Sequence, residues 1–333
     1  MDSLSQLLLG AAVGYAVAGK KLGKKSLLIG GFAGTLPDLD VIPLSLFKDD
    51  FIMLKHHRGF THSILFSLLA PIPFSKLTQK LFKTLKETSL SWLYFWAFLT
   101  HSLLDCFTTW GTQLFWPFSY RVALNSIFII DPAYTIWLLL TVIICSFIPV
   151  SKKSVKIMYT GIILSSFYLL LSLGIKLKIH KEFIHYFKSH NINVTHMMTR
   201  PSPFNIILWS ATAKTEDGYY MAFRSLLDTN YNEPPKLIPN KEIKDTFLND
   251  EIANYVKFVT NKFYTQTYFE NGVYIHDLRF GSFNLLDPSF PAYIFSYKLI
   301  KTSDGKTVMK NQNPKFKDTS NLFTLLFKRI QGH

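Results

Sequence analysis

Long apolar runs without acidic or basic residues dominate the first half of the chain. They cover residues 3–19, 26–37, 59–75, 88–104, 132–150 and 157–175. Such runs are typical of membrane helices, since about 20 apolar residues cross a hydrocarbon core roughly 30 Å thick. We therefore predict six membrane helices. The last two runs are long enough to cross the core, whereas the second is short and typical of a half-helix packed inside a bundle.

After residue 198 the apolar runs become short and are separated by turn residues. Residues 205–213 and 219–227 flank an Asp-Gly pair, and residues 265–269 and 273–280 flank an Asn-Gly pair. These dipeptides between β-rich runs predict two hairpins. The remaining periodicity predicts a helix over 241–263, a strand over 292–300 and an amphipathic helix over 321–330.

Together these patterns predict the fold class and its parts. We expect an all-α polytopic membrane domain of about six helices, residues 1–176. A juxtamembrane linker, residues 177–198, leads to a small α+β domain on the extracytoplasmic side, residues 199–333.

Composition supports a membrane protein and excludes several other classes. Hydrophobic residues make up 48% of the chain and charged residues 17%, which excludes intrinsic disorder and a solvated coiled coil. The net charge of +14 divides evenly, with +7 before residue 176 and +7 after residue 175, so no basic tail suggests a nucleic-acid partner. Both cysteines, Cys106 and Cys145, lie in predicted membrane helices, which excludes a disulfide framework.

The lysines predict the orientation of the chain in the membrane. Eleven of them lie in residues 20–25, 76–86 and 152–156, which follow the first, third and fifth apolar runs, against the single acid Glu87. Positively charged short loops remain on the cytoplasmic side. We therefore expect the N-terminus and everything after residue 175 to lie on the extracytoplasmic side.

Histidines and carboxylates gather at the opposite ends of the same runs. Asp38 and Asp40 end the second run, His57 and His62 open the third, His101 and Asp105 end the fourth, and Asp131 opens the fifth. On the lysine-derived topology all of them lie at one membrane face. Ionisable groups at membrane depth are costly and usually functional, so this coincidence predicts one convergent site.

The residue types and their spacing indicate a metal site. His101 and Asp105 are four residues apart and share a helix face. Imidazoles and carboxylates together suit zinc, with manganese or iron as alternatives. The predicted metal ligands are Asp38, Asp40, His57, His62, His101 and Asp105.

Structural roles for the same residues remain open at this point. His101 and Asp105 could be a hydrogen-bonded pair, Asp38 and Asp40 an interfacial turn, and Asp131 a helix N-cap. The gathering of four separate segments at one face favours a site. In the second half, strand alternation places Asp277 and Arg279 on one side and predicts a surface ion pair.

Five motifs, in this order, carry a family resemblance. They are MDSLSQLLLGAAVG, LPDLD, HHRGFTHS, HSLLDCFTTWGTQLFWPFS and FIIDPAYT, within residues 1–135. The chain thereby resembles the bacterial membrane-bound metal-dependent hydrolases, labelled LexA-binding, inner-membrane-associated hydrolases. The resemblance covers residues 1 to about 140, and PSPFNIILWS with DGYYMAFRSLLD extends it toward the longer members. It implies a multi-pass protein of the bacterial inner membrane.

The resemblance also implies a chemistry. The family is distantly similar to the zinc-dependent phospholipase C and P1 nuclease group, all-α enzymes that cleave phosphate esters with one to three zinc ions. His101 and Asp105 match that group's His-x-x-x-Asp motif, Asp38 the aspartate of the family's PDLD turn, and His57 and His62 its HRGxTH motif. Members commonly carry Thr-His where this chain has Ser5-Gln6, and an amide is a poorer zinc ligand than imidazole.

The leading hypothesis is therefore a membrane-bound hydrolase that cleaves an ester with a metal-activated water. A phosphate ester of a phospholipid or another envelope component is the expected substrate, and the bilayer the expected partner. Asp40 could act as general base instead of ligand, and Arg58 is predicted to bind a phosphate oxygen. The alternatives are a non-catalytic scaffold or degenerate hydrolase, which Gln6 favours, and a metal or proton transporter, which the gathering of polar groups at one face disfavours.

Overall fold

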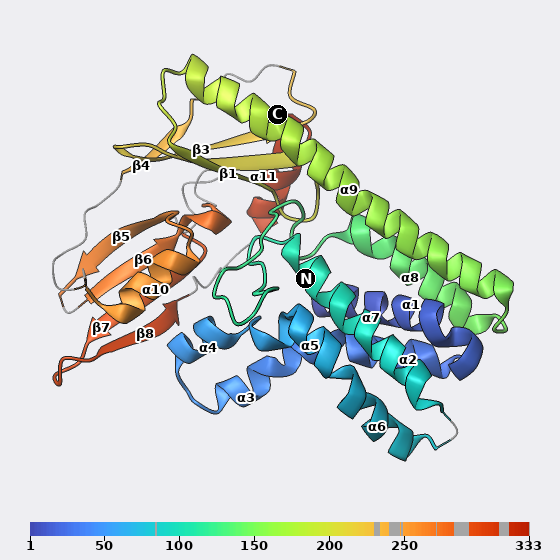
Figure 1. The fold of residues 1–333 in the computed structure, drawn as a ribbon. Helices are drawn as coiled ribbons and strands as arrows, with labels where there is room; N and C mark the ends of the chain where they lie inside the picture. The colour runs from blue at the N-terminus through green and yellow to red at the C-terminus, as the bar shows by residue number, and fades with distance from the viewer. Residues whose placement is uncertain are drawn as a thin grey trace. The chain divides into compact units, whose positions relative to one another are not determined.

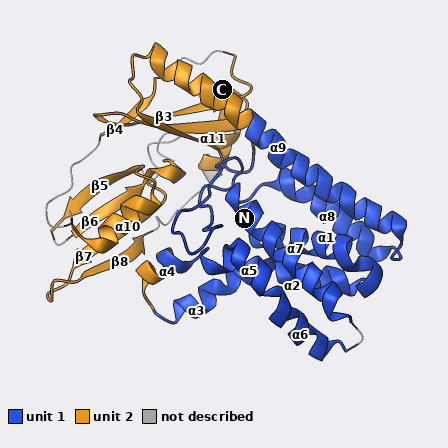
Figure 2. Ribbon diagram, in the orientation of Figure 1, with its two compact units in different colours: residues 1–47, 55–174, 203–205 blue, residues 48–54, 175–202, 206–333 orange. Residues whose placement is uncertain are grey.

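The computed structural model describes residues 1–83, 85–229, 234–239, 247, 249–270, 272–282, 293–312 and 320–332. They form two compact units, shown in different colours in Figure 2. Unit 1 comprises residues 1–47, 55–174 and 203–205, and unit 2 comprises residues 48–54, 175–202 and 206–333.

Unit 1 is helical (Figure 1). Its elements are α1 (Ser3–Leu22), α2 (Lys25–Thr35), η1 (Leu36–Asp40), α3 (Val41–Ser45), η2 (Phe60–His62), α5 (Ile64–Leu69), α6 (Pro71–Leu81), α7 (Glu87–Cys106), α8 (Pro132–Phe147) and the first part of α9 (Lys152–Ser189). Helix α1 contacts α2, α7 and α8, and Asp2 caps its first turn by accepting a hydrogen bond from the Ser5 N–H group.

Helices α1 and α2 approach each other at backbone distance. A Cβ atom added at Gly10 would lie 2.3 Å from the Gly30 carbonyl oxygen, and one added at Gly34 would lie 2.4 Å from the Gln6 carbonyl oxygen. Only glycine allows this separation. Ala33, Leu90 and other buried residues complete the core around this contact, which holds the end of α2 against the start of α1.

Unit 2 contains two four-stranded antiparallel sheets, each with its strands in sequence order. The first consists of β1 (His196–Pro201), β2 (Leu208–Lys214), β3 (Gly218–Ser225) and β4 (Lys236–Pro239), and the second of β5 (Tyr264–Phe269), β6 (Gly272–Asp277), β7 (Ser296–Lys301) and β8 (Thr307–Gln312). The helices α10 (Glu251–Val259) and α11 (Ser320–Ile330), the turn η4 (Leu278–Phe280) and most of α4 (Asp50–His56) also belong to this unit.

The last turns of α9 pack on the first sheet of unit 2. Glu182 forms an ion pair with Arg224 of β3 at 2.7 Å, and His180 Nδ1 lies 3.3 Å from Thr199 Oγ1 of β1. Phe183 and Phe187 on the same turns are fully buried. This packing explains why α9 continues well beyond its apolar part.

The predicted fold class, an all-α polytopic domain with about six membrane helices, is wrong. Within the described residues, two helical segments are long and apolar enough to cross a membrane, Lys25–Ser45 and Lys152–Ser189. The third predicted helix is divided into α5, with 6 residues, and α6, with 11 residues. At 1.5 Å per residue both are too short to cross a core of roughly 30 Å. Helices α1 and α7 instead bury many of their apolar side chains inside unit 1, and unit 2 contains two full sheets.

Several elements of the second half were predicted correctly. Strands β2 and β3 pair as one predicted hairpin, and β5 and β6 pair as the other. The predicted closing helix is present as α11. Of the helix expected over 241–263, α10 is observed at Glu251–Val259, and residues 241–246 lie outside the described residues.

The prediction of a surface ion pair between Asp277 and Arg279 is wrong. Both side chains are buried, and Arg279 Nη2 lies 2.7 Å from Asp277 Oδ2. Asp277 ends β6, an inner strand of its sheet, and also caps η4, so the pair is covered by the chain around it.

Candidate metal centre

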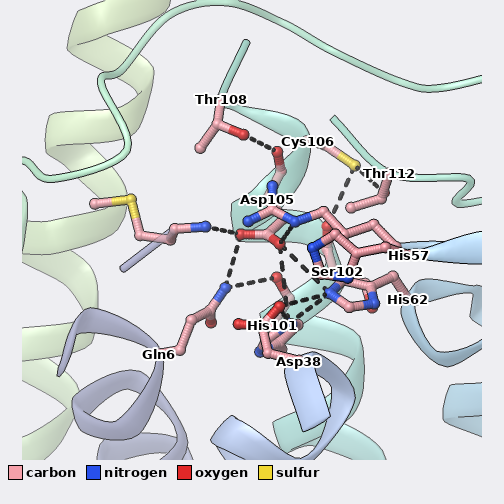
Figure 3. A network of polar contacts seen from close by, with 12 residues as sticks. Gln6, Asp38, His57, His62, His101, Ser102, Asp105, Cys106, Thr108 and Thr112 are labelled. Atoms are coloured by element: carbon pink, nitrogen blue, oxygen red, sulfur yellow. Dashed lines mark hydrogen bonds and ion pairs between the residues drawn. The ribbon is translucent and has the colours of Figure 1, made fainter. Parts of the chain in front are cut away.

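Three short segments of unit 1 bring two histidines and two aspartates together (Figure 3). Asp38 lies in η1 at the end of α2, His62 lies in η2, and His101 and Asp105 lie one turn apart on α7. One ligand atom from each residue lies within 4.8 Å of all the others. This cluster can hold a metal ion.

His62 Nε2 is central to the cluster. It lies 3.1 Å from Asp38 Oδ1, 3.1 Å from His101 Nε2 and 3.6 Å from Asp105 Oδ2. His62, His101 and Asp105 are fully buried, and Asp38 is partly exposed. The cluster is therefore mostly shielded from solvent, with Asp38 at its open side.

The outer nitrogen of each histidine defines its protonation. His101 Nδ1 lies 2.7 Å from the Gly34 carbonyl oxygen, which only accepts, so Nδ1 carries the proton. Thr61 Oγ1 donates to Asp40 Oδ2 at 3.0 Å and therefore accepts from His62 Nδ1, also at 3.0 Å. The two Nε2 atoms lie 3.1 Å apart, and His62 Nε2 is also 3.1 Å from Asp38 Oδ1, which only accepts, so a bound cation would take the place of the proton in these contacts.

The electrostatic environment favours the metal-binding forms of His101 and Asp105. Burial, together with the neighbouring His62, lowers the pKa of His101 to about 4, so its imidazole is neutral near pH 7. Burial acts to raise the pKa of Asp105, but the N-terminal ammonium group of Met1 and the Arg58 guanidinium outweigh it and hold this pKa below its usual range. Neutral imidazole and ionised carboxylate are the ligand forms that metals require.

The two oxygens of Asp105 have different surroundings. Oδ1 accepts hydrogen bonds from the Met1 ammonium group and, at 2.9 Å, from Gln6 Nε2. Oδ2 faces the cluster and is buried without a hydrogen-bond partner. Its nearest cation is the Arg58 guanidinium, with Nε at 3.3 Å, and because buried acceptors normally accept a hydrogen bond, an Oδ2 without one fits a metal ligand.

Asp40 and His57, two further predicted ligands, pair with each other beside the cluster. His57 Nδ1 lies 2.8 Å from Asp40 Oδ1, and Asp40 Oδ2 accepts from the Arg58 N–H group at 3.1 Å and from Thr61 Oγ1. Asp40 thus fixes the loop that carries His57, Arg58 and His62. Neither residue belongs to the four-residue cluster found among the described residues.

Arg58 is a buried cation beside Asp105. Its backbone adopts a left-handed conformation, with φ of 58°, which directs the side chain inward, and its Nε lies 3.3 Å from Asp105 Oδ2. Neither Nε nor Nη1 has a hydrogen-bond partner. Nε has Asp105 as its ion-pair partner, so Nη1 is the buried donor that fits the binding of an anion next to the cluster.

The structure also shows residues that sequence reasoning missed. Thr61 lies within the HHRGFTHS motif, so the motif itself could have indicated it. The Gly34 carbonyl group has no side-chain signal and could not have been found from the sequence. Asp131 is an N-cap of α8, bonded to the Ala133 and Tyr134 N–H groups, as the structural alternative predicted.

Comparisons with known proteins identify the family of the chain. Residues 1–182 match the model of the YdjM inner membrane protein family. The chain is 30% identical over 199 residues to "Uncharacterized protein YfhP" of Bacillus subtilis (strain 168), covering 56% of this chain and 58% of that protein. It is 31% identical over 110 residues to "Inner membrane protein YbcI" of Escherichia coli (strain K12), covering 32% and 62%. The chain thus spans about three fifths of the length of each relative.

No solved structure matches the chain. The family match extends over more than half of the chain and includes all four residues of the cluster. The chain therefore belongs to the YdjM inner membrane protein family.

Proposed function

We propose that this chain is a metal-dependent hydrolase of the inner membrane that cleaves an ester. A phosphate ester of a lipid or envelope component is the proposed substrate class. The supporting observation is the buried cluster itself: the Nε2 atoms of His62 and His101 lie 3.1 Å apart between the carboxylates of Asp38 and Asp105, beside the Arg58 guanidinium.

The four cluster residues would hold the ion. A divalent cation, zinc first and manganese or iron as alternatives, supplies Lewis acidity when bound, which activates water and polarises the ester. The Gly34 carbonyl group and Thr61 hold the two imidazoles in the ligand tautomer. Arg58, whose Nη1 is buried without a hydrogen-bond partner, would bind a phosphate oxygen where negative charge grows during attack.

Asp40 and His57 complete the site as neighbours of the ligands. We assign Asp40 a positioning role, because its carboxylate accepts from His57, the Arg58 backbone and Thr61 at once. His57 remains partly exposed at the edge of the cluster. Loss of the Asp40 carboxylate would release the loop that places Arg58 and His62.

The site is proposed to face the extracytoplasmic side. In Figure 1 the turns α1–α2, α6–α7 and α8–α9 lie at one end of unit 1, and the eleven lysines lie in these turns and in the adjoining parts of α1, α2, α6 and α9. Lys25 Nζ lies 5.4 Å from the Phe82 ring centroid, and Tyr15 Oη donates to Ser154 Oγ at 2.8 Å, which agrees with this grouping. The cluster lies at the other ends of α2 and α7, so the positive-inside rule favours an extracytoplasmic site.

The direct test is metal content and phosphate-ester hydrolysis of the detergent-purified full chain. We expect stoichiometric metal in the wild type and its loss in His101→Ala and Asp105→Asn. His56→Ala is the matched control, because His56 is exposed and next to the site loop but outside the cluster. A wild type that stays metal-free after incubation with zinc would refute the proposal.

A second variant separates metal binding from catalysis. Arg58→Lys keeps the positive charge but loses the planar pair of donors. We expect it to retain its metal and to lose hydrolysis of p-nitrophenyl phosphate by about 100-fold, the range for removing one oxyanion donor. Metal binding without hydrolysis in the wild type would instead indicate a non-catalytic scaffold.

A further inference from the structure

An apolar groove lies on unit 1, away from the metal centre. Its volume is about 610 Å³, within the range of roughly 300–1,000 Å³ of small-molecule sites. Its lining residues come from α5, the start of α6 and the first half of α7: Leu68, Pro71, Ile72, Glu87, Thr88, Ser91, Trp92 and Phe95. His101, the nearest cluster residue on α7, follows Phe95 by six residues, or about 9 Å of helix.

The groove is bordered by large apolar side chains that the rest of the unit does not cover. Leu68, Ile72 and Trp92 are each more than half exposed. Leu77 and Leu81 of α6 are also more than half exposed. An apolar surface of this kind marks a binding region, and a membrane protein has acyl chains beside it.

Four lysines lie close in sequence to the groove, whose one charged lining residue is Glu87. Lys76 and Lys80 of α6 and Lys83 and Lys86 of the following turn are all exposed, and Glu87 is the one acid in residues 76–87. None of the four lysines forms an ion pair with another residue in the described part of the chain. Even with Glu87 counted, this segment carries a net charge of +3, so it is complementary to an anionic group.

We propose that the groove binds an acyl chain of an anionic phospholipid from the bilayer, with the lipid phosphate held by the lysines at the α6–α7 turn. The apolar lining and the adjacent cations provide the two signals, an acyl chain and a basic patch, that together give stable lipid binding. The proposed occupant of the groove is therefore a lipid and not a second protein.

This lipid site is independent of the proposed hydrolase function. The lysines of the α6–α7 turn precede Glu87, and His101 follows Glu87 by 14 residues on α7, which is about 21 Å of helix. A phosphate at the lysines is therefore too far from the metal cluster to be the group that is hydrolysed. The bound lipid would be a resident of the protein and not its substrate.

The test is photo-cross-linking in vesicles of phosphatidylethanolamine and phosphatidylglycerol that contain the full chain. The probe is phosphatidylglycerol with a diazirine on one acyl chain, and phosphatidylcholine with the same diazirine is the neutral comparison. We expect cross-links to concentrate in residues 68–95, with about tenfold or greater preference for phosphatidylglycerol.

Two single substitutions test the groove, and two triple lysine-to-glutamine variants, one of them a control, test the role of charge. Thr88→Trp fills the groove from an exposed position, and Ile72→Glu places a charge in it, so both should lower cross-linking in residues 68–95 at least fivefold. Replacing Lys76, Lys80 and Lys83 with glutamine should remove the preference for phosphatidylglycerol. The same replacement of Lys152, Lys153 and Lys156, which are exposed at the start of α9, is the matched control and should retain it.

Three outcomes would overturn the proposal. Cross-links spread evenly over exposed apolar helices such as α9, and unchanged in both groove variants, would show that the groove is ordinary bilayer contact. Equal labelling by both lipids would show that the lysines do not select an anionic headgroup. Cross-links between two protein copies at residues 68–95 would identify the groove as a protein interface.

Discussion

Gln6 stands where members of the hydrolase family that the sequence resembles commonly carry histidine. It is fully buried, and its Nε2 donates to Asp105 Oδ1 at 2.9 Å, on the side of the carboxylate that faces away from His62 and His101. An imidazole at this position would reach the same oxygen and add a ligand next to the cluster. The glutamine that replaces the usual histidine therefore contacts one particular atom of the site, Asp105 Oδ1.

Gln6→His should therefore strengthen metal binding. We expect zinc affinity to rise at least tenfold, or the number of zinc ions per chain to increase, as measured by titration and elemental analysis of the purified protein. Gln6→Met, which preserves the volume without a nitrogen ligand, is the control. If both variants bind the same amount of zinc with wild-type affinity, position 6 does not contribute to the metal site.

His276 in unit 2 makes the second sheet sensitive to acid. The imidazole lies between Thr267 Oγ1 and Ser296 Oγ and stacks on Tyr293 with the ring centroids 3.9 Å apart. Burial lowers its pKa in the folded state to about 4, against 6.5 when exposed. Below pH 6.5 the unfolded chain binds more protons than the folded one, so this contribution to stability falls as the pH falls toward 4.

The expected loss is about 3 kcal/mol between pH 6.5 and pH 4, at about 1.4 kcal/mol per pKa unit. Hydrogen exchange of peptides from β5 to β7, corrected for the intrinsic rate at each pH, measures it. His276→Gln should remove most of this pH dependence, whereas His196→Gln, at an exposed histidine on β1, should retain it. An unchanged pH dependence in His276→Gln would assign the acid sensitivity to other groups.

The identity of the site residues was easier to predict from the sequence than the contacts that each of them makes. His62, His101, Asp38 and Asp105 are brought together, and the spacing of His101 and Asp105 on one helix was enough to pair them. The pairing of Asp40 with His57 depends on the left-handed backbone of Arg58 and on the Thr61 hydroxyl group. Such local geometry has no periodic signal in a sequence.

At the scale of elements, the contact between α1 and α2 positions one ligand. The carbonyl group of Gly34 accepts a hydrogen bond from His101 Nδ1. A Cβ atom added at the same residue would lie 2.4 Å from the Gln6 carbonyl oxygen. Gly34→Ala must therefore separate the two helices and shift this acceptor. We expect a loss of about 1–3 kcal/mol in stability, typical of overpacking, together with weaker metal binding.

Gly31→Ala is the matched control for this prediction. It lies on the same helix, but a Cβ atom there would be 3.4 Å from its nearest neighbour, an ordinary contact. Thermal unfolding and zinc titration of both variants separate a general effect of alanine in α2 from the specific contact. Equal metal affinity in Gly34→Ala and the wild type would show that the Gly34 carbonyl group does not orient His101.

Elements were predictable where their signal is local. The hairpins β2–β3 and β5–β6 followed from turn dipeptides, and α11 followed from its amphipathic period. The break between α5 and α6 lies just before Pro71, which favours the start of a helix, but the apolar run around it concealed this boundary. Hydropathy alone does not distinguish a helix that faces lipid from one that faces other helices.

At the scale of the whole molecule, the predicted fold class was wrong because hydropathy does not distinguish helices that face lipid from helices that face other helices. The apolar run of α1 resembles a membrane helix, yet most of its residues are buried against neighbouring helices. Two segments remain as candidate spans, of which Lys152–Ser189 is the more apolar and has only 17% of its apolar window buried. Of these two candidates, α9 is the less covered by the rest of the chain, and it continues from unit 1 into unit 2.

The proposed orientation can be tested with two single cysteines on this framework, because Cys106 and Cys145 are buried. Ser303 is exposed in the turn between β7 and β8 of unit 2, and Lys83 is exposed among the lysines of unit 1. We expect a membrane-impermeant maleimide to label Ser303→Cys in intact cells and Lys83→Cys only after permeabilisation, because the lysines remain on the cytoplasmic side.

The two sites give opposite results only if a span separates them, so the pair also tests whether α9 crosses the membrane. Labelling of both cysteines only after permeabilisation would place unit 2 and the lysines on the cytoplasmic side. The lysine rule would then fail for this chain, and the metal site would need a cytoplasmic ester as its substrate. The reverse pattern, with Lys83→Cys labelled in intact cells, would invert the proposed orientation while keeping α9 as a span.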